Sequence, residues 1–156
     1  MTSFSLSFSH SQIAVFDPDL ADPFNDWTDA HVSQGFAWRP GSVSFSTLED
    51  GGQISIEVVD SSWLVEASSP AARIILVPFL VPQHRAVEIG SIIHGVRIEL
   101  TAGHFELAFE HGRRDKLGLW AKFYFRPASP PIEPRIIRAD SLLKVPGTLE
   151  MTARPA

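Results

Sequence analysis

The sequence predicts an all-β fold: an antiparallel β-sandwich, with a barrel-like variant as the alternative, and one short helix near residues 27–34. Three observations predict it. Apolar and polar residues alternate along several short segments, as in Phe4, Leu6 and Phe8 with serines between them. Turn-forming residues separate these segments at the spacing of a sandwich or barrel. Only one segment has both helix start and helix stop signals. The length of 156 residues fits a single domain, 1–156.

The first third of the chain contains two predicted strands, a loop and the helix. Residues 4–8 alternate, residues 12–16 are mostly apolar, and prolines and aspartates make residues 17–25 a loop. We expect Asp26 to cap the helix and Gly35 to end it in the left-handed conformation. Trp27 or Ala30, together with Val32, is expected to face the core. A helix of two turns needs such packing to persist.

The remainder is predicted to be strands. They span residues 42–48, 53–59, 73–81, 96–101, 105–110 and 119–126, and a last strand at 148–152 closes the sheet. Gly51 and Gly52 are interpreted as a hairpin turn. Pro78 interrupts the most apolar strand and therefore requires an edge or a bulge. The proline-rich residues 128–134 are expected to form a surface loop.

Cysteine is absent, which excludes disulfides, thiolate zinc sites and cysteine nucleophiles. A chain without cysteine suits a reducing compartment, and the N-terminus lacks the basic and apolar regions of a signal peptide. We therefore expect a cytoplasmic location. The longest apolar run, residues 74–81, is far below the ~20 residues of a membrane helix. No membrane insertion is expected, although association with a membrane through a partner stays open.

Charge is distributed unevenly along the chain. Residues 1–72 contain ten acidic residues and one basic residue, whereas residues 73–156 contain eight acidic and twelve basic residues. Five aspartates fall within thirteen residues: Asp17, Asp19, Asp22, Asp26 and Asp29. This segment is either a solvated acidic loop or a surface that attracts a basic partner. An acidic half of this kind argues against direct binding to nucleic acid, because contacts to phosphates supply most of that affinity.

The sequence contains no pattern that is typical of a catalytic or metal-binding site. His104 and Glu106 share one face of a predicted strand, with Glu110 further along, but the opposite face is apolar, so His104 and Glu106 are expected to point to solvent. No His-x-His or His-Glu-x-x-His spacing and no Gly-x-Ser-x-Gly motif is present. We expect no metal, no cofactor and no enzymatic activity. An enzyme whose site assembles from dispersed residues is the alternative that sequence patterns do not address.

The four tryptophans are Trp27, Trp38, Trp63 and Trp120. Buried aromatics are what the core of a β-sandwich needs, so core packing is the first interpretation, and a carbohydrate or ligand platform is the second. Trp38 differs from the others because it lies in a turn-rich segment beside Arg39. Tryptophan and arginine are enriched in the binding hot spots of protein interfaces. The pair is therefore a candidate contact.

Residues 23–45 resemble the competence protein J family. The features that carry the resemblance are Asp26-Trp27-Thr28-Asp29, Gly35 followed by the aromatic Phe36, and the strand Ser42-Val43-Ser44-Phe45. The preceding residues 6–16 are also similar to the opening of that family. The resemblance extends over residues 4–48.

Members of that family inhibit a DNA-entry nuclease in bacterial competence. The resemblance implies a non-catalytic protein that binds a DNA-degrading nuclease and covers its active site with an acidic surface. Such a surface speeds association with a basic cleft. The candidate contacts are Asp17, Asp19, Asp22, Asp26, Asp29, Trp38 and Arg39. A small-ligand or carbohydrate-binding β-sandwich is the alternative function, and a homodimer stays open.

Overall fold

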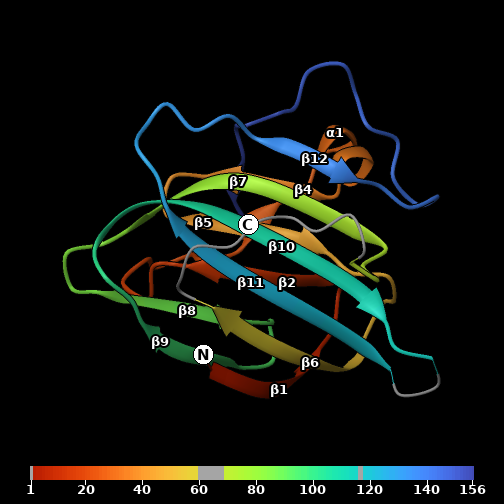
Figure 1. Ribbon diagram of the computed structural model, residues 1–156, viewed down its shortest axis with the longest axis horizontal. Coiled ribbons are helices and arrows are strands. Elements are labelled where there is room, and N and C mark those ends of the chain that lie inside the picture. The colour runs from red at the N-terminus through yellow and green to blue at the C-terminus, as the bar shows by residue number, and fades with distance from the viewer. Residues whose placement is uncertain (1, 60–68, 116–117) are drawn as a thin grey trace.

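A computed structural model describes residues 2–59, 69–115 and 118–156 and shows two β-sheets packed face to face (Figure 1). In order across the sheet, the six-stranded sheet contains β1 (Thr2–Phe8), β6 (Gly52–Val59), β11 (Leu119–Pro127), β10 (Gly103–Arg113), β7 (Arg73–Val81) and β12 (Arg135–Arg138). The five-stranded sheet contains β4 (Phe36–Arg39), β5 (Ser42–Ser46), β2 (Gln12–Phe16), β8 (Ala86–Gly90) and β9 (Gly95–Glu99). The predicted sandwich is confirmed, and the two sheets stay separate.

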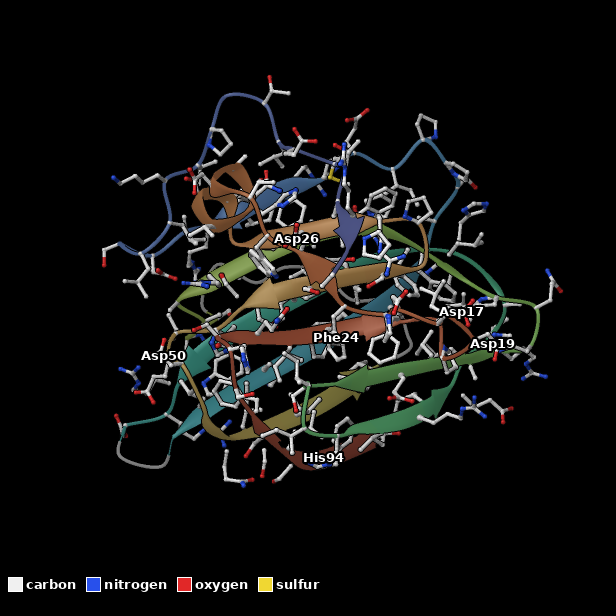
Figure 2. The ribbon with its side chains drawn as sticks, turned by 180° about the vertical axis from the view of Figure 1, so that it is seen from behind. Asp17, Asp19, Phe24, Asp26, Asp50 and His94 are labelled. Atoms are coloured by element: carbon white, nitrogen blue, oxygen red, sulfur yellow. The ribbon has the colours of Figure 1, made fainter. Side chains whose placement is uncertain are left out.

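Two smaller elements lie outside these sheets. The helix α1 spans Asp29–Gln34, and a two-stranded ladder joins β3 (Asn25–Asp26) to β13 (Arg154–Pro155). Figure 2 views the molecule from behind, with the five-stranded sheet toward the reader. In the part of the chain that the structure describes, no helix is long and apolar enough to cross a bilayer.

Apolar side chains, which alternate with polar ones along the strands, form the core between the sheets. Phe105, Leu107 and Phe109 on β10 are buried, as predicted, while His104 on the opposite face is exposed. Phe45 of β5 stacks on Phe109 with ring centroids 4.4 Å apart, so the two sheets meet through aromatic contact. These side chains belong to one continuous apolar cluster that draws on both sheets.

Several details of strand pairing differ from the expectation. β11 pairs with β6 in parallel, whereas the other pairings within both sheets are antiparallel. Gly51 and Gly52 do not make a hairpin, because β5 and β6 belong to different sheets and the glycines lie at the corner between them. Pairing partners are set by the chain path, which local alternation does not encode.

Within the two main sheets, β4, β8 and β12 were not predicted, and neither were the two-residue strands β3 and β13 that lie outside them. β4 lies in the segment interpreted as turn-rich and forms a hairpin with β5 through Pro40 and Gly41. Conversely, the strand expected at residues 148–152 is absent. Each missed strand has only two to five residues, which is too short for alternation to distinguish it from a loop.

The prediction that Pro78 requires a strand edge or a bulge is confirmed. On one side it pairs with Glu106 of β10. On the other side β12 pairs with β7 only from Ile74 to Leu76, so among the described strands this edge of β7 is open at Pro78. A proline that lacks an N–H group is tolerated there because no ladder bond is lost.

The helix begins later than predicted, and Thr28 rather than Asp26 caps it. The Thr28 hydroxyl accepts a hydrogen bond from the His31 N–H, and His31 Nδ1 accepts one from the Thr28 N–H. Gly35 ends the helix at φ +86°, as expected. A Cβ at Gly35 would lie 3.0 Å from a Leu143 methyl group, so close packing adds to the conformational demand.

The inward face of α1 is polar, which contradicts the expectation of an apolar face. Val32 and Ala30 are exposed, whereas His31 and Gln34 are buried. The Gln34 side chain exchanges two hydrogen bonds of 2.8 Å with the backbone of Glu150. Extended backbone of the C-terminal segment, rather than a sheet, faces the helix. Buried amide and imidazole groups satisfy that backbone.

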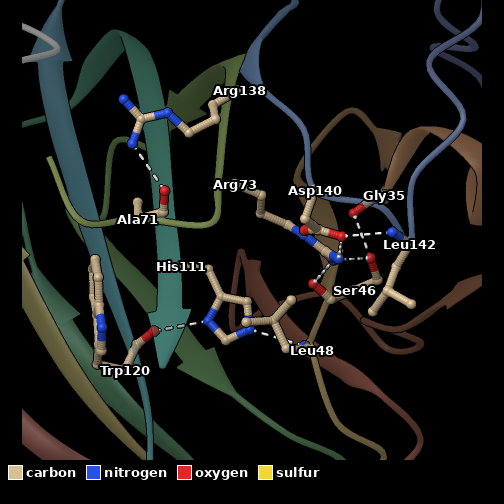
Figure 3. A network of polar contacts seen from close by, with 10 residues as sticks. All are labelled: Gly35, Ser46, Leu48, Ala71, Arg73, His111, Trp120, Arg138, Asp140 and Leu142. Carbon is tan, nitrogen blue, oxygen red and sulfur yellow. Dashed lines mark hydrogen bonds and ion pairs between the residues drawn. The ribbon is translucent and has the colours of Figure 1, made fainter. Parts of the chain in front are cut away.

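A buried arginine joins both sheets to the C-terminal segment (Figure 3). Arg73 of β7 is 1% exposed and makes a bidentate pair with Asp140, at 2.6 and 3.0 Å. Its Nη1 also donates to the carbonyl and hydroxyl of Ser46 on β5, at 2.8 and 2.7 Å. Burial by itself would raise the pKa of Asp140. Bonds from Arg73 and the Leu142 N–H outweigh burial and hold this pKa below its usual range.

His111 of β10 forms a second polar link between the sheets. Its Nδ1–H donates to the Trp120 carbonyl at 2.7 Å, and its Nε2 accepts from the Leu48 N–H at 3.0 Å (Figure 3). A second ring proton would face that N–H donor. Burial, together with the charge of Arg73, lowers the pKa of His111 to about 4 against the opposing effect of the Trp120 carbonyl.

We predict that Asp140→Asn lowers the free energy of unfolding by about 3–5 kcal/mol, because it leaves a buried guanidinium without its counter-charge. Urea denaturation at pH 7 measures this loss. Glu99→Gln is the control, because it breaks the exposed ion pair with Arg85 and should cost at most about 1 kcal/mol. Equal small losses in both variants would contradict a structural role for the buried pair.

We also predict that stability falls as the pH drops from 6.5 toward 4. In the unfolded chain His111 takes up a proton near the ordinary histidine pKa of 6.5, whereas the folded ring resists protonation until about 4. Over that window the unfolded state binds more protons, and the loss attributable to His111 is about 3 kcal/mol. Denaturation of wild type and His111→Asn at pH 7 and pH 4.5 tests this. The variant should show the weaker pH dependence, and the exposed control His104→Asn should retain the wild-type dependence.

Candidate partner-binding face

The aspartate-rich segment 17–29 runs across the outer face of the five-stranded sheet, which explains why β2 and β5 are buried on both sides. Phe24 packs edge-on against Phe16, with ring centroids 5.6 Å apart, and Figure 2 shows it over this face. The Asn25 amide donates to the carbonyls of Ala37 and Ser42, at 2.8 and 3.3 Å. The segment is therefore fixed to the sheet.

Arg39 contributes to that attachment. Its Nε donates to Asn25 Oδ1 at 2.6 Å, and its Nη2 donates to the Asp22 carbonyl. Burial lowers the pKa of Arg39, and the charge of Asp22 partly opposes this shift. The guanidinium nevertheless stays charged at neutral pH. With these donors engaged, Arg39 holds the acidic segment in place.

Asp17 and Asp19 lie at one end of the face (Figure 2), and both of their carboxylates contact His84. The Ala86 N–H donates to His84 Nδ1 at 3.2 Å, so the ring proton is on Nε2, which lies 3.0 Å from Asp17 and 3.3 Å from Asp19. Potential ligand atoms of the three residues lie within 4.8 Å of one another. A metal ion bound to His84 Nε2 would require the ring proton to be on Nδ1. That proton would then point at the Ala86 N–H, which is itself a donor. The cluster is therefore suited to hydrogen bonding rather than to a metal ion.

Asp22, Asp26 and Asp29 are exposed farther along the segment. Among residues 2–59, 69–115 and 118–156, none of the three has an ion-pair partner within 4.0 Å. By contrast, Glu49, Glu57, Glu99 and Glu106 are each paired with a lysine or an arginine. The charges of Asp26 and Asp29 are therefore available to a partner, as is that of Asp22 apart from its longer-range attraction to Arg39.

Trp38 lies between the two sheets at the Asp17 end of the face. Its indole N–H donates to the Pro78 carbonyl at 2.7 Å, and the ring packs against the core. The other side of the ring borders a groove of about 450 Å³ that also contains Pro40, Leu80 and Ile132. Trp120 is buried, as expected, and Trp63 lies outside the described residues.

A second concavity lies between the β1–β2 turn and α1. Trp27 and Val32 form part of its lining, and Asp26 stands at its margin. Trp27 was predicted to face the core from the helix. It instead precedes the helix and is only half-buried. The structure thus divides the seven predicted contacts. Asp17, Asp19, Asp22, Trp38 and Arg39 lie toward one end of the segment, and Asp26 and Asp29 lie toward the helix.

Two residues of this face were missed by sequence reasoning. His84 is 67 positions from Asp17, and no spacing pattern connects them. Val32 was expected in the core, but it is 58% exposed, whereas the neighbouring His31 is buried.

Comparison with known proteins identifies relatives of this chain. The family model of competence protein J (ComJ) matches residues 5–125. Among solved structures, the fold is similar to the crystal structure of ComJ, inhibitor of the DNA degrading activity of NucA, from Bacillus subtilis. The TM-score is 0.69 at 22% identity, over 82% of this chain and 96% of that chain. No curated protein matches the sequence.

The structural likeness at this identity shows a shared fold, and the family match spans well over half of the chain. It extends beyond the N-terminal residues that carried the resemblance in the sequence, into β11. This chain belongs to the competence protein J family.

Proposed function

We propose that this protein is a non-catalytic inhibitor of a DNA-degrading nuclease, which it binds with the acidic face formed by residues 17–29. The observation that carries the proposal is the similarity, over 96% of that chain, to the inhibitor of NucA from Bacillus subtilis. The absence of cysteine is compatible with action in the reducing cytoplasm, alone or in a membrane-associated complex formed through the nuclease.

The electrostatics of the face support inhibition by charge. A nuclease must hold a DNA backbone, so its cleft presents cations. Asp22, Asp26 and Asp29 present carboxylates without an ion-pair partner in the described chain, on a segment fixed by Asn25 and Arg39. A rigid anionic surface loses little conformational entropy on binding. It can therefore occupy positions that phosphates would take.

The carbohydrate-binding alternative rested on exposed aromatic side chains. Trp120 is 7% exposed, and the indole N–H of Trp38 is already bonded to Pro78. Trp120 therefore offers no open face, and Trp38 has no free N–H group for a ligand. The inhibitor therefore accounts better for the residues that are exposed.

We predict that the triple variant Asp22→Asn, Asp26→Asn and Asp29→Asn slows association with the nuclease about tenfold at low ionic strength, because complementary charge accelerates docking. Thr28 caps the helix, so Asp26→Asn should not cost a cap. Binding kinetics with the purified NucA-type nuclease of the source organism, and degradation of labelled double-stranded DNA, measure the effect. Raising the salt beyond about 0.15 M should slow the wild type toward the variant.

The control is Glu99→Gln, Asp115→Asn and Glu133→Gln, three exposed sites that change the net charge equally. This control should associate at nearly the wild-type rate. If both triple variants slow association to the same extent, net charge rather than the acidic face is responsible. If the wild type leaves DNA degradation unchanged, the proposed function is wrong.

A further inference from the structure

The concavity beside α1 combines apolar walls with acidic margins. It measures about 500 Å³ and is lined by His10, Ser11, Gln12, Asn25, Asp26, Trp27, Val32 and Ser46. All of these residues lie within the range that the family model matches. The concavity borders the helix end of the acidic segment and is separate from the groove beside Trp38.

Trp27 is held in place before any partner arrives. Its Nε1–H donates to Gln12 Oε1 at 3.1 Å, and its ring meets the His31 ring edge-on at 6.4 Å. Val32 lines the same concavity and is 58% exposed. Tryptophan is enriched in interface hot spots, and a ring that is already held in place loses little conformational entropy on binding.

The carboxylates around the concavity favour a cationic ligand. Asp26 lines it, and Asp50 stands beside it because the Ser11 hydroxyl donates to its carboxylate at 2.9 Å. Figure 2 shows Asp26 on the acidic face and Asp50 at its edge. Neither carboxylate has an ion-pair partner among the described residues. Arg154 lies on the other side of Asp26, in a neighbouring depression that also contains Glu150.

We infer that this concavity receives an arginine side chain of the nuclease. The planar guanidinium would stack on Trp27 and pair with Asp26, while its methylene groups contact Val32. Arginine fits better than lysine because its head group is planar, is weakly hydrated and stacks on aromatic rings. An arginine engaged here cannot hold a phosphate. The inference rests on the proposed function and names the chemistry of its contact.

Val32→Arg tests the inference, because the exposed position should tolerate the change while the new charge repels the incoming cation. We expect the inhibition constant, measured with the same nuclease and labelled DNA, to rise about tenfold or more. Ile93→Arg is the matched control, since Ile93 is also 58% exposed but lies in the β8–β9 turn. Val32→Glu reverses the sign of the charge at the same site and should retain more inhibition than Val32→Arg.

The outcomes separate the alternatives. A selective loss in Val32→Arg, with an unchanged urea midpoint, supports the inference. If Val32→Arg inhibits as strongly as the wild type, the inference is wrong but the proposed function stands. The same holds if Val32→Arg and Val32→Glu lose inhibition equally. A loss in Leu80→Arg without one in Val32→Arg places the contact at the groove beside Trp38 and also overturns it. No inhibition by the wild type overturns the proposed function together with this inference.

Discussion

The guanidinium of Arg73 is the charge that the rest of the structure must accommodate. A cation buried between two sheets is tolerated only when a counter-charge and hydrogen-bond acceptors surround it. Asp140 supplies the charge from the C-terminal segment, and Ser46 supplies two acceptors from the opposite sheet. The Arg73 side chain thereby links β7, β5 and the C-terminal segment. The adjacent Leu143 packs on Gly35, which fixes the end of the helix.

The candidate binding face depends on this bracing. The helix presents Asp29 and Val32 outward because its buried residues, His31 and Gln34, hydrogen-bond to backbone near the C-terminus. Residues 126–156 lie beyond the range matched by the family model, yet they provide Asp140 and the backbone of Glu150 and Thr152. The family-matched part of this protein is thus supported by a segment outside the match.

The acidic segment shows how a loop becomes a rigid surface. Phe24 packs on Phe16 of the five-stranded sheet, and the Asn25 amide donates to the Ala37 carbonyl of the same sheet. Asp22 and Asp26 are exposed. Polar groups on the sheet side are paired, so this part of the segment is held without using the carboxylates of Asp22 and Asp26. The charges that remain can act on a partner, and the concavity containing Trp27 gives them a nearby apolar anchor.

The sequence by itself determined the two-layered β architecture, the longer strands, the edge position of Pro78 and the helix stop at Gly35. Each follows from local alternation or from the backbone demands of a single residue. The Asp26-Trp27-Thr28-Asp29 motif also located the family and part of the candidate face. Only the tertiary structure decided that Thr28 caps the helix, that His84 joins Asp17, and that Arg73 is paired with Asp140. The last two contacts span 67 positions. Short strands such as β4 were likewise decided by their partners, because four residues carry too little pattern of their own.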